Sequence, residues 1–413
     1  MVAGDAAGPG SSGVKEKSHE RLPDSHPRCV LLLVVNVSWF FLSHRLPLAL
    51  RARQLGFEVY LATRIDSAAD RAAIEAAGIR VYDLAIGRAE QGVFDNLKVL
   101  AALFLLYRRL APDVVHHVTM KPVILGGIAA RLARVPSVVS AIPGLGYAFV
   151  ADGWVAATRR VLLRAGLRIA LRHSNSTAIF QNPDDLSGLV NAGVVDARSC
   201  VLIRGAGVDT KTFVAWPEPV GIVRVLLASR MLREKGVETF VEAARILLRR
   251  GVAADFQLAG KPDSENPGSL TVSQLRDWHS SGIVRWLGHR EDMVALLRSV
   301  HVVCLPSFYG EGVPKILIEA AASGRALVAS DMPGCREIVR HEFNGLLVPP
   351  KQALALADAL STMIQDKEKR RLFGRCGRLL AETEFDAANV VDETMRVYER
   401  LRERAILLPT YRQ

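Results

Sequence analysis

Short apolar runs alternate with helix-length segments along most of this chain, and the alternation starts twice. The first set of strand-like runs lies at residues 30–35, 57–63, 79–84, 113–118 and 137–141. The second set lies at residues 223–228, 255–259, 283–287, 301–305, 326–329 and 345–348. Short, largely apolar strands separated by helices are typical of parallel sheets that are covered on both faces. The pattern predicts an α/β protein with two doubly wound, Rossmann-like domains.

Chain length and turn-forming residues indicate where these domains divide. The chain has 413 residues, which suits two domains of about 150–200 residues each. Pro217, Pro219 and Gly221 mark an interdomain linker at 214–222, because Pro and Gly interrupt regular structure. The domains that we expect are 28–213 and 223–384, followed by a C-terminal helix at 385–413 that packs back toward the first domain. We expect residues 1–27 to be a disordered leader, either a start-site artefact or a tether.

The charge distribution and the cysteines indicate which kinds of partner the protein binds and in which cellular compartment it works. Residues 28–213 hold 22 Lys and Arg against 13 Asp and Glu, whereas residues 214–413 hold 28 against 25. A basic first half favours an anionic partner, but without interleaved aromatic residues we do not expect nucleic acid. The five scattered cysteines are typical of reduced thiols in the cytoplasm. We expect no signal peptide, because residues 1–27 contain no apolar stretch. We also expect no membrane-spanning helix, because no apolar run reaches the roughly 18–20 residues that one needs.

A segment that follows the fourth strand of the second set carries two carboxylates at the start of a helix. Pro314 suits the first turn of that helix, and the free amides of Gly312 and Val313 would then form an anion site. Glu311 stands in the loop before the helix, and Glu319 lies about one and a half turns along it. One helix could therefore bind a phosphate and the hydroxyls of a sugar. The alternative is a strand-to-helix turn with two solvated glutamates.

A pair of cations follows the first strand of the second set. Arg230 and Lys235 lie in the segment after residues 223–228. Ligands of open α/β sheets bind outside the carboxyl ends of the strands, so these side chains lie where a diphosphate would bind. The alternative is a surface loop with ordinary charges. Two such clusters at strand ends of one sheet make that alternative weaker.

Together these residues resemble the family-4 retaining glycosyltransferases of GT-B fold, through Arg230, the Lys235-Gly236 step and the pair Glu311 and Glu319. The resemblance implies two domains that face each other across a cleft, and transfer with retention from a nucleoside diphosphate sugar, with a UDP-sugar favoured. It implies that Arg230 and Lys235 bind the diphosphate, that Glu311 faces the transferred sugar and that Glu319 holds the ribose. No metal motif is visible, and no cofactor is expected. Two further runs similar to this family are 331–339 and 344–349.

The first domain resembles a narrower group that adds N-acetylhexosamines or related sugars to polyprenyl-diphosphate glycans. His117, Thr119 and Lys121 lie in one run similar to this group, and Gly144 lies in another. The resemblance implies that Thr119, Lys121 and Gly144 line the acceptor side and that His117 has a catalytic role. The first strand-to-helix loop, 36–44, lacks the glycines of many family members. Trp39 in this loop is therefore expected to serve the acceptor.

Two adjacent histidines, His116 and His117, lie near the end of one predicted strand. Their side chains should point to opposite faces of the sheet, so at most one is expected to reach the cleft. Histidine is a common proton carrier, and the resemblance favours His117. The alternative for each is packing in the core or on the surface. The two histidines do not make a convincing metal site without nearby carboxylates.

A row of arginines points to a membrane. Arg160, Arg164, Arg168 and Arg172 recur every four residues among apolar side chains in a segment expected to be helical. A basic amphipathic helix of this kind can lie on an anionic bilayer. The alternative is a solvated helix face.

We therefore expect a glycosyltransferase that works in the cytoplasm at the inner face of the membrane. It would move a hexose, such as an N-acetylhexosamine, from a nucleotide sugar to a lipid-linked saccharide in surface polysaccharide or glycan synthesis. Two alternatives remain: a nucleotide-sugar epimerase of the same architecture, and an inactive partner subunit that binds a nucleotide sugar.

Overall fold

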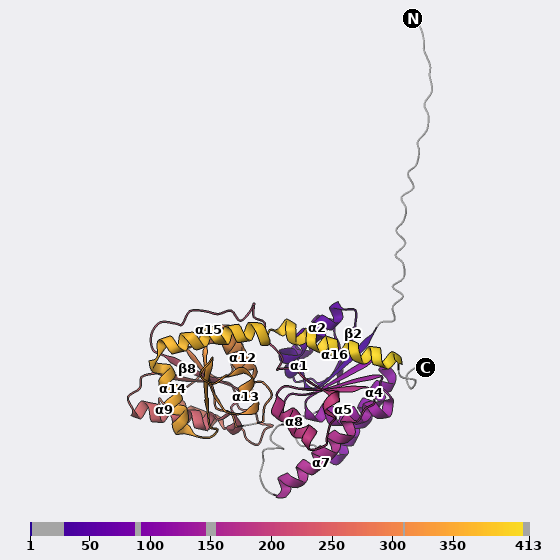
Figure 1. Ribbon diagram of the computed structural model, residues 1–413, viewed down its shortest axis with the longest axis horizontal. Coiled ribbons are helices and arrows are strands. Elements are labelled where there is room, and N and C mark those ends of the chain that lie inside the picture. Colours follow the sequence, from indigo (N-terminus) through magenta and orange to yellow (C-terminus); the bar gives the residue numbers. More distant parts are fainter. Residues whose placement is uncertain (2–28, 87–91, 146–153, 309, 408–413) are drawn as a thin grey trace.

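Two parallel β-sheets, each with helices on both faces, make up the protein (Figure 1). The computed structural model describes Met1 and residues 29–86, 92–145, 154–308 and 310–407. Within these residues the first half of the chain forms a seven-stranded sheet and the second half forms a six-stranded sheet. The expected α/β class with two doubly wound domains is confirmed.

The first sheet has the strand order β3-β2-β1-β4-β5-β6-β7, and every pairing is parallel. Its direction of winding reverses between β1 and β4, which is where ligands of such sheets bind. Two of its strands, β6 and β7, were not expected, and β7 has only three residues. The strands are β1 (Val30–Val37), β2 (Glu58–Arg64), β3 (Arg80–Asp83), β4 (Val114–Val118), β5 (Ser137–Ile142), β6 (Ser176–Phe180) and β7 (Cys200–Leu202).

Helices of the first domain connect these parallel strands. Asn182 and Ser67 act as N-caps of α8 and α3, since each side chain accepts a hydrogen bond from the amide three residues later. The helices are α1 (Ser38–His44), α2 (Leu46–Gln54), α3 (Ala68–Ala76), α4 (Val93–Leu110), α5 (Met120–Ala133), α7 (Trp154–Leu171) and α8 (Pro183–Asn191), with a 3-10 turn η1 (Ala197–Ser199).

The second sheet has the order β10-β9-β8-β11-β12-β13, so its switch point lies between β8 and β11. Its strands are β8 (Arg224–Ala228), β9 (Asp255–Ala259), β10 (Arg285–Trp286), β11 (Val302–Leu305), β12 (Ala326–Ser330) and β13 (Gly345–Val348). Its helices are η2 (a 3-10 turn, Arg233–Lys235), α9 (Val237–Arg249), α10 (Val272–Ser280), α11 (Met293–Arg298), α12 (Lys315–Ala322), α13 (Pro333–Ile338) and α14 (Ala353–Gln365).

Two helices at the end of the chain run along both domains. α15 (Lys367–Glu384) packs on α12 in the second domain, and α16 (Ala387–Leu407) packs on α2 and β5 in the first. Figure 1 shows α15 and α16 nearly in line along the top of the molecule. Where the chain crosses back, Val208 exchanges backbone hydrogen bonds with Phe385 and Ala387. The two crossing segments are thus tied to each other.

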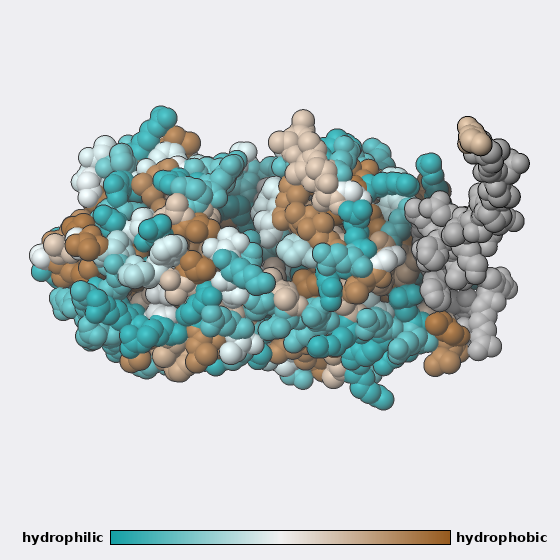
Figure 2. All heavy atoms as spheres, turned by 90° about the horizontal axis from the view of Figure 1, so that it is seen from above, coloured by the Kyte–Doolittle hydropathy of each residue, from teal (hydrophilic) through white to brown (hydrophobic). Residues whose placement is uncertain are grey.

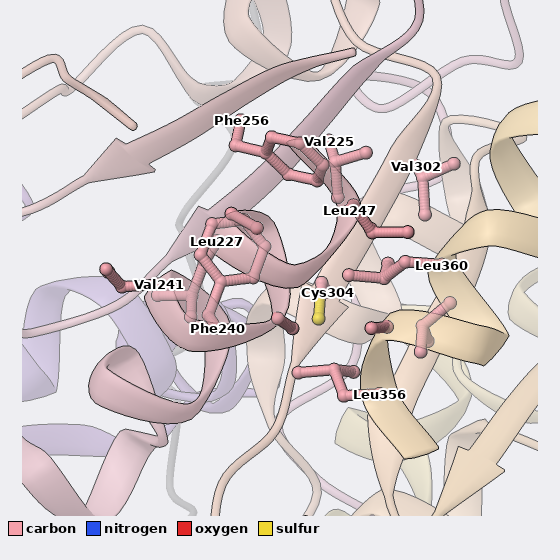
Figure 3. Packing of buried hydrophobic residues seen from close by; sticks show 14 of the residues in the cluster. Val225, Leu227, Phe240, Val241, Leu247, Phe256, Val302, Cys304, Leu356 and Leu360 are labelled. Atoms are coloured by element: carbon pink, nitrogen blue, oxygen red, sulfur yellow. The ribbon is translucent and has the colours of Figure 1, made fainter. Parts of the chain in front are cut away.

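Each sheet is covered by a buried apolar cluster on either face. In the second domain, α9 and α14 pack on one face, where the rings of Phe240 and Phe256 meet edge-on with centroids 6.0 Å apart (Figure 3). Cys304 is buried in the same cluster (Figure 3), and burial raises the pKa of its thiol. The five cysteines, which all lie in the described part of the chain, are free thiols.

The face of the molecule seen in Figure 2 is mostly polar. Figure 2 shows hydrophilic residues over much of the upper face, with hydrophobic residues in small separate groups between them. Of the helices in the described residues, none is both long enough and apolar enough to span a bilayer.

Candidate functional site

Lys235 and Glu311 form the centre of the candidate site. The ammonium of Lys235 contacts the carboxylate of Glu311, and their side chains are only 14% and 15% exposed. Lys235 comes from the η2 turn after β8, and Glu311 comes from the segment after β11. β8 and β11 are neighbours at the switch point of the sheet, so the carboxyl ends of the two strands bring the pair together.

The η2 turn is pressed close against the end of β11. Gly236 has a φ of +73°, and a Cβ at this position would lie 2.0 Å from the carbonyl oxygen of Pro306. Only glycine fits this left-handed, crowded position. Ser307 Oγ lies 2.6 Å from Glu311 Oε1 and 3.1 Å from the carbonyl oxygen of Glu234. Ser307, which was not predicted from the sequence, therefore orients the Glu311 carboxylate through this hydrogen bond.

Arg230, the second predicted phosphate ligand, is paired with an acidic residue. Its guanidinium Nη1 lies 2.6 Å from Asp263 Oδ2, in the loop after β9. Asp263 was not a candidate, because nothing in the sequence links it to Arg230 across 33 positions. The two predicted cations thus both follow the carboxyl end of β8, and their acidic partners Asp263 and Glu311 follow the neighbouring strands β9 and β11.

Glu319, on α12, is held in a nearly buried position. Its side chain is 9% exposed and lies 3.2 Å from Lys315 Nζ, one turn earlier on the helix. Burial raises the pKa of Glu319, and the charge of Lys315 opposes that rise. Lys315 Nζ also donates a hydrogen bond of 2.9 Å to the carbonyl oxygen of Ser43 at the end of α1. Lys315, another residue missed from the sequence, therefore connects Glu319 with the first domain.

The predicted anion site at Gly312 and Val313 needs correction. The amide of Val313 donates a hydrogen bond of 3.1 Å to Gln181 Oε1, at the end of β6. α12 begins at Lys315 with Pro314 as its N-cap, so neither Gly312 nor Val313 lies in its first turn. The amide expected to bind phosphate is thus occupied by a side chain of the other domain.

Gly312 is required for contact between protein segments. A Cβ on Gly312 would lie 1.8 Å from the carbonyl oxygen of Pro143, and a Cβ on Gly334 would lie 1.6 Å from that of Gly312. A Cβ on Gly144 would lie 2.6 Å from the carbonyl oxygen of Gly310. Gly144, predicted on the acceptor side, therefore touches the loop that carries Glu311. We expected the amide of Gly312 to help bind an anion, but the closest neighbours of a Cβ here would be the Pro143 carbonyl oxygen and the Gln181 side chain, both of the first domain.

The prediction that His117 reaches the cleft is wrong. His117 is fully buried, and its Nε2 lies 2.9 Å from the hydroxyl of Tyr107 on α4. Its ring fills the space that Gly126 of α5 leaves open. Burial lowers the pKa of His117 to about 3. The two histidines do face opposite sides of the sheet, because His116 is also buried and pairs with the hydroxyl of Tyr398 on α16 at 2.6 Å.

The other acceptor-side candidates lie near the carboxyl edge of the first sheet. Thr119 follows β4 and is the N-cap residue of α5, with φ +76°, which is strained for a β-branched residue. Lys121 lies in the first turn of α5, and partial burial lowers its pKa. Trp39 lies on α1 with its ring edge-on to Phe40. Their role toward an acceptor stays a prediction.

The arginine row is only partly a helix face. Arg160, Arg164 and Arg168 lie on α7, but Arg172 follows its last residue, Leu171. Arg168 is engaged elsewhere, since it donates hydrogen bonds to the carbonyl oxygens of Gly193 and Ala192 at the end of α8. Arg168 therefore caps α8, whereas Arg160 and Arg164 lie along α7 and Arg172 is exposed just after its end.

Ion pairs across the domain boundary hold the site together. Arg204 lies 2.6 Å from Glu337, and Arg64 lies 3.0 Å from Glu265. No group of three or more His, Cys, Asp or Glu suited to a metal ion occurs among the residues that the structure describes.

Comparison with known proteins identifies the family. Residues 223–366 match the model "Glycosyl transferases group 1", and residues 30–182 match the model "Glycosyl transferase 4-like". The chain belongs to these glycosyltransferases. The two matches cover the second sheet and every strand of the first sheet except β7, and the Lys235–Glu311 pair lies within the match at 223–366.

This glycosyltransferase is similar to two curated transferases. It is 28% identical over 341 residues to the N,N'-diacetylbacillosaminyl-diphospho-undecaprenol α-1,3-N-acetylgalactosaminyltransferase of Campylobacter jejuni, over 78% of this chain and 86% of that one. It is 25% identical over 317 residues to the UDP-Gal:α-D-GlcNAc-diphosphoundecaprenol α-1,3-galactosyltransferase of Escherichia coli, over 73% and 79%.

Solved structures of the same fold include two with high coverage. Anabaena HepE in complex with UDP aligns with a TM-score of 0.70 at 20% identity, over 90% of this glycosyltransferase and 100% of HepE. Sucrose-phosphate synthase of Thermosynechococcus elongatus aligns with a TM-score of 0.73 at 20% identity, over 91% and 100%. The expected GT-B-like architecture is confirmed.

Proposed function

We propose that this glycosyltransferase moves a hexose or N-acetylhexosamine from a UDP-sugar to a saccharide linked through a diphosphate to a polyprenyl lipid. The observation that carries the donor half is the Lys235–Glu311 pair beside Arg230, at the carboxyl ends of adjacent strands. Lys235 and Arg230 supply positive charge for a diphosphate leaving group, and Glu311 supplies a carboxylate for the transferred sugar.

The acceptor half is supported by the two curated relatives. Both are named for undecaprenyl-diphosphate-linked acceptors and for transfer of GalNAc or galactose. The family resemblance adds retention: the new bond takes the same configuration as the bond that breaks. Glu319 would hold the ribose hydroxyls, since a nearly buried carboxylate on α12 can accept two hydrogen bonds.

A transfer assay tests this proposal. Purified protein is incubated with UDP-Gal, UDP-GalNAc, UDP-Glc or UDP-GlcNAc and with a polyprenyl-diphosphate disaccharide or monosaccharide. We expect one UDP-sugar to give a product extended by one sugar, with an α linkage by NMR. If a UDP-sugar is altered without any acceptor and a second sugar nucleotide appears, the chain is an epimerase. If a UDP-sugar binds and nothing turns over, the chain is an inactive binding subunit.

We also propose that the first domain docks on an anionic membrane at the inner face, where a lipid-linked acceptor would lie. Large apolar side chains are exposed at the start of α4 and on α7, namely Val93, Phe94, Leu97, Val161 and Leu162. α4, α5 and α7 pack side by side on one face of the first sheet (Figure 1). Exposed apolar residues beside arginines suit the headgroup region of a bilayer.

Vesicle sedimentation tests the docking. The double variant Arg160→Gln/Arg164→Gln should bind vesicles rich in anionic lipid less than the wild type, because each basic residue near such a surface contributes about 1 kcal/mol. Binding of the wild type should fall as salt rises. Arg198→Gln is the matched control, since Arg198 is exposed in the same domain but far along the chain on η1. Wild-type protein that ignores anionic vesicles at low salt would contradict the docking.

A further inference from the structure

Lys315, the first residue of α12, connects the donor-binding domain with the first domain. Its ammonium donates a hydrogen bond of 2.9 Å to the carbonyl oxygen of Ser43 at the end of α1. The same nitrogen lies 3.2 Å from Glu319 Oε1, one turn further along α12. An ammonium has three hydrogens, so one can point at the carbonyl and another at the carboxylate. The first domain therefore fixes the position of the charge that Glu319 meets.

The stability of α12 alone does not account for a lysine at this position. The amino end of a helix favours acidic side chains, because the helix dipole is positive there. Yet α12 opens with Lys315 and has no acidic residue in its first turn. A lysine that precedes a glutamate by four residues also stabilises a helix less than the reverse order. Both rules disfavour Lys315, so its contact with Glu319 is better explained by the role of Glu319.

Glu319 needs a nearby cation to stay ionised, because its side chain is only 9% exposed. Burial raises the pKa of Glu319, and the charge of Lys315 lowers it. Among the residues that the structure describes, Lys315 is the one ion-pair partner of Glu319. Loss of Lys315 would therefore raise the pKa of Glu319 further and favour its protonated form.

The charged groups of the elements around α12 do not replace Lys315, since each is paired with another residue or is neutral. They are Arg336 (paired with Asp331) and Glu337 (with Arg204) on α13, Arg378 (with Glu382) on α15, Lys235 (with Glu311) on η2, and His44 on α1, whose pKa burial lowers to about 3. Protonation of Glu319 is thus controlled mainly by its burial and by Lys315.

We propose that Lys315 is a positioning residue for the donor: its ammonium keeps the Glu319 carboxylate ionised and oriented to accept hydrogen bonds from the ribose of the nucleotide. An ionised carboxylate only accepts hydrogen bonds, whereas a protonated one loses part of that capacity to its own hydrogen. The contact with Lys315 involves Oε1, so Oε2 remains for the ribose hydroxyls. Through the carbonyl of Ser43, the first domain takes part in donor binding. This inference rests on the proposed role of Glu319 in the donor site.

The pH dependence of UDP binding tests the proposal. Lys315→Met keeps the length of the side chain and removes its charge. Calorimetry would give the Kd of UDP for Lys315→Met and for the wild type between about pH 6 and about pH 8.5, and their ratio cancels the titration of UDP itself. We expect the variant to bind more weakly as pH falls, with a ratio that grows by up to about 10-fold per pH unit, because one proton on Glu319 competes with the ribose.

Three further variants separate charge from structure. Lys315→Arg restores a cation and should bind UDP much as the wild type does at every pH. Lys369→Met is the matched control, because Lys369 is 27% exposed against 31% for Lys315 and pairs with Glu342 instead. In a Glu319→Gln background, the addition of Lys315→Met should produce no pH-dependent change, since glutamine does not titrate. Lys315→Gln repeats the measurement if circular dichroism shows that Lys315→Met does not fold.

Every other outcome overturns the proposal or the donor site beneath it. If Lys315→Met differs from the wild type by the same factor at every pH, or not at all, Lys315 does not act through the charge of Glu319. If Lys315→Arg behaves as Lys315→Met does, the positive charge is not what matters. If the pH dependence persists in the Glu319→Gln background, another group titrates and the proposal is wrong. If the wild type does not bind UDP, the proposed donor site itself is wrong.

Discussion

The ammonium of Lys235 contacts the carboxylate of Glu311, although 76 positions separate the two residues along the chain. The contact exists because β8 and β11 lie side by side at the switch point of the second sheet. A donor diphosphate that binds Lys235 would draw its charge away from Glu311 and free the carboxylate for the sugar. Both side chains are largely shielded from water, which strengthens such an exchange of partners.

The donor cations give the first prediction. Arg230→Ala and Lys235→Ala should each weaken donor binding by about 10- to 100-fold, since a hydrogen bond to a charged group contributes about 1.5–3 kcal/mol. Titration calorimetry with UDP and with the UDP-sugar measures the effect. Arg233→Ala is the control, because Arg233 lies on the same η2 turn but pairs with Glu238 near the surface. If both variants bind UDP and the UDP-sugar with wild-type affinity, Arg230 and Lys235 do not bind the donor.

The two glutamates should divide their roles. Glu311→Gln should lower kcat by about 100-fold with little change in donor Kd, because a group that acts on the reacting sugar contributes mainly in the transition state. Glu319→Ala should instead weaken donor binding. Ser307→Ala should produce a smaller loss of kcat than Glu311→Gln, since Ser307 only orients the carboxylate. Steady-state kinetics and calorimetry measure both effects. If Glu311→Gln mainly weakens donor binding and Glu319→Ala mainly lowers kcat, the proposed roles are wrong.

Contact between the domains supplies a third prediction. Gln181→Ala leaves the buried amide of Val313 without its partner, at a cost of about 1–3 kcal/mol. Hydrogen exchange at the Val313 amide should become at least about 10-fold faster, and exchange in the core of the second sheet should not change. Gln352→Ala is the control, because this exposed glutamine caps α14 without a side-chain hydrogen bond. Equal exchange at Val313 in wild type and Gln181→Ala would argue against the contact in solution.

Burial of Glu319 should have a pH-dependent effect on stability. The pKa of Glu319 is raised above its ordinary 4.5 in the folded protein, so the folded state holds a proton that the unfolded chain has already lost. Stability falls as pH rises through this window and stays lower above it. Glu319→Gln should therefore raise the melting temperature at neutral pH, by roughly 2–4 °C if the gain is about 1 kcal/mol.

The difference between Glu319→Gln and wild type should vanish near pH 4.5, where the folded wild type is protonated. Thermal unfolding followed at both pH values measures it. Glu238→Gln, at an exposed position of α9, is the matched control. A Glu319→Gln variant that is less stable at neutral pH would show that the Lys315 contact outweighs the burial.

Metal dependence gives the last prediction. Arg230 and Lys235 place two positive charges where a diphosphate leaving group would depart, so we expect transfer to persist in excess EDTA. Activity that is lost in EDTA and returns with magnesium or manganese would contradict this. In that case, the activity of Lys235→Ala would be measured with and without EDTA. The comparison would show whether the magnesium or manganese ion acts beside Lys235.

The sequence by itself determined the two-domain α/β fold and the place along it of Arg230 and Lys235, the cations proposed to bind the donor. Alternating strands and helices with two starts allow few arrangements, because buried parallel strands need helices on both faces. Arg230, Lys235 and Glu311 directly follow strands of one parallel sheet, whose carboxyl ends meet at one edge. Their convergence was therefore predictable from order along the chain.

Only the tertiary structure decided which side chains of the first domain face the donor site. His117 follows the expected alternation along β4, but the helix that covers it, with Tyr107 and Gly126 against the ring, depends on contacts distant in sequence. The same holds for Gln181 and Val313, which belong to different domains. Local pattern fixes the face of a strand or helix on which a side chain lies, whereas packing between elements far apart in sequence decides whether that face meets protein or a ligand.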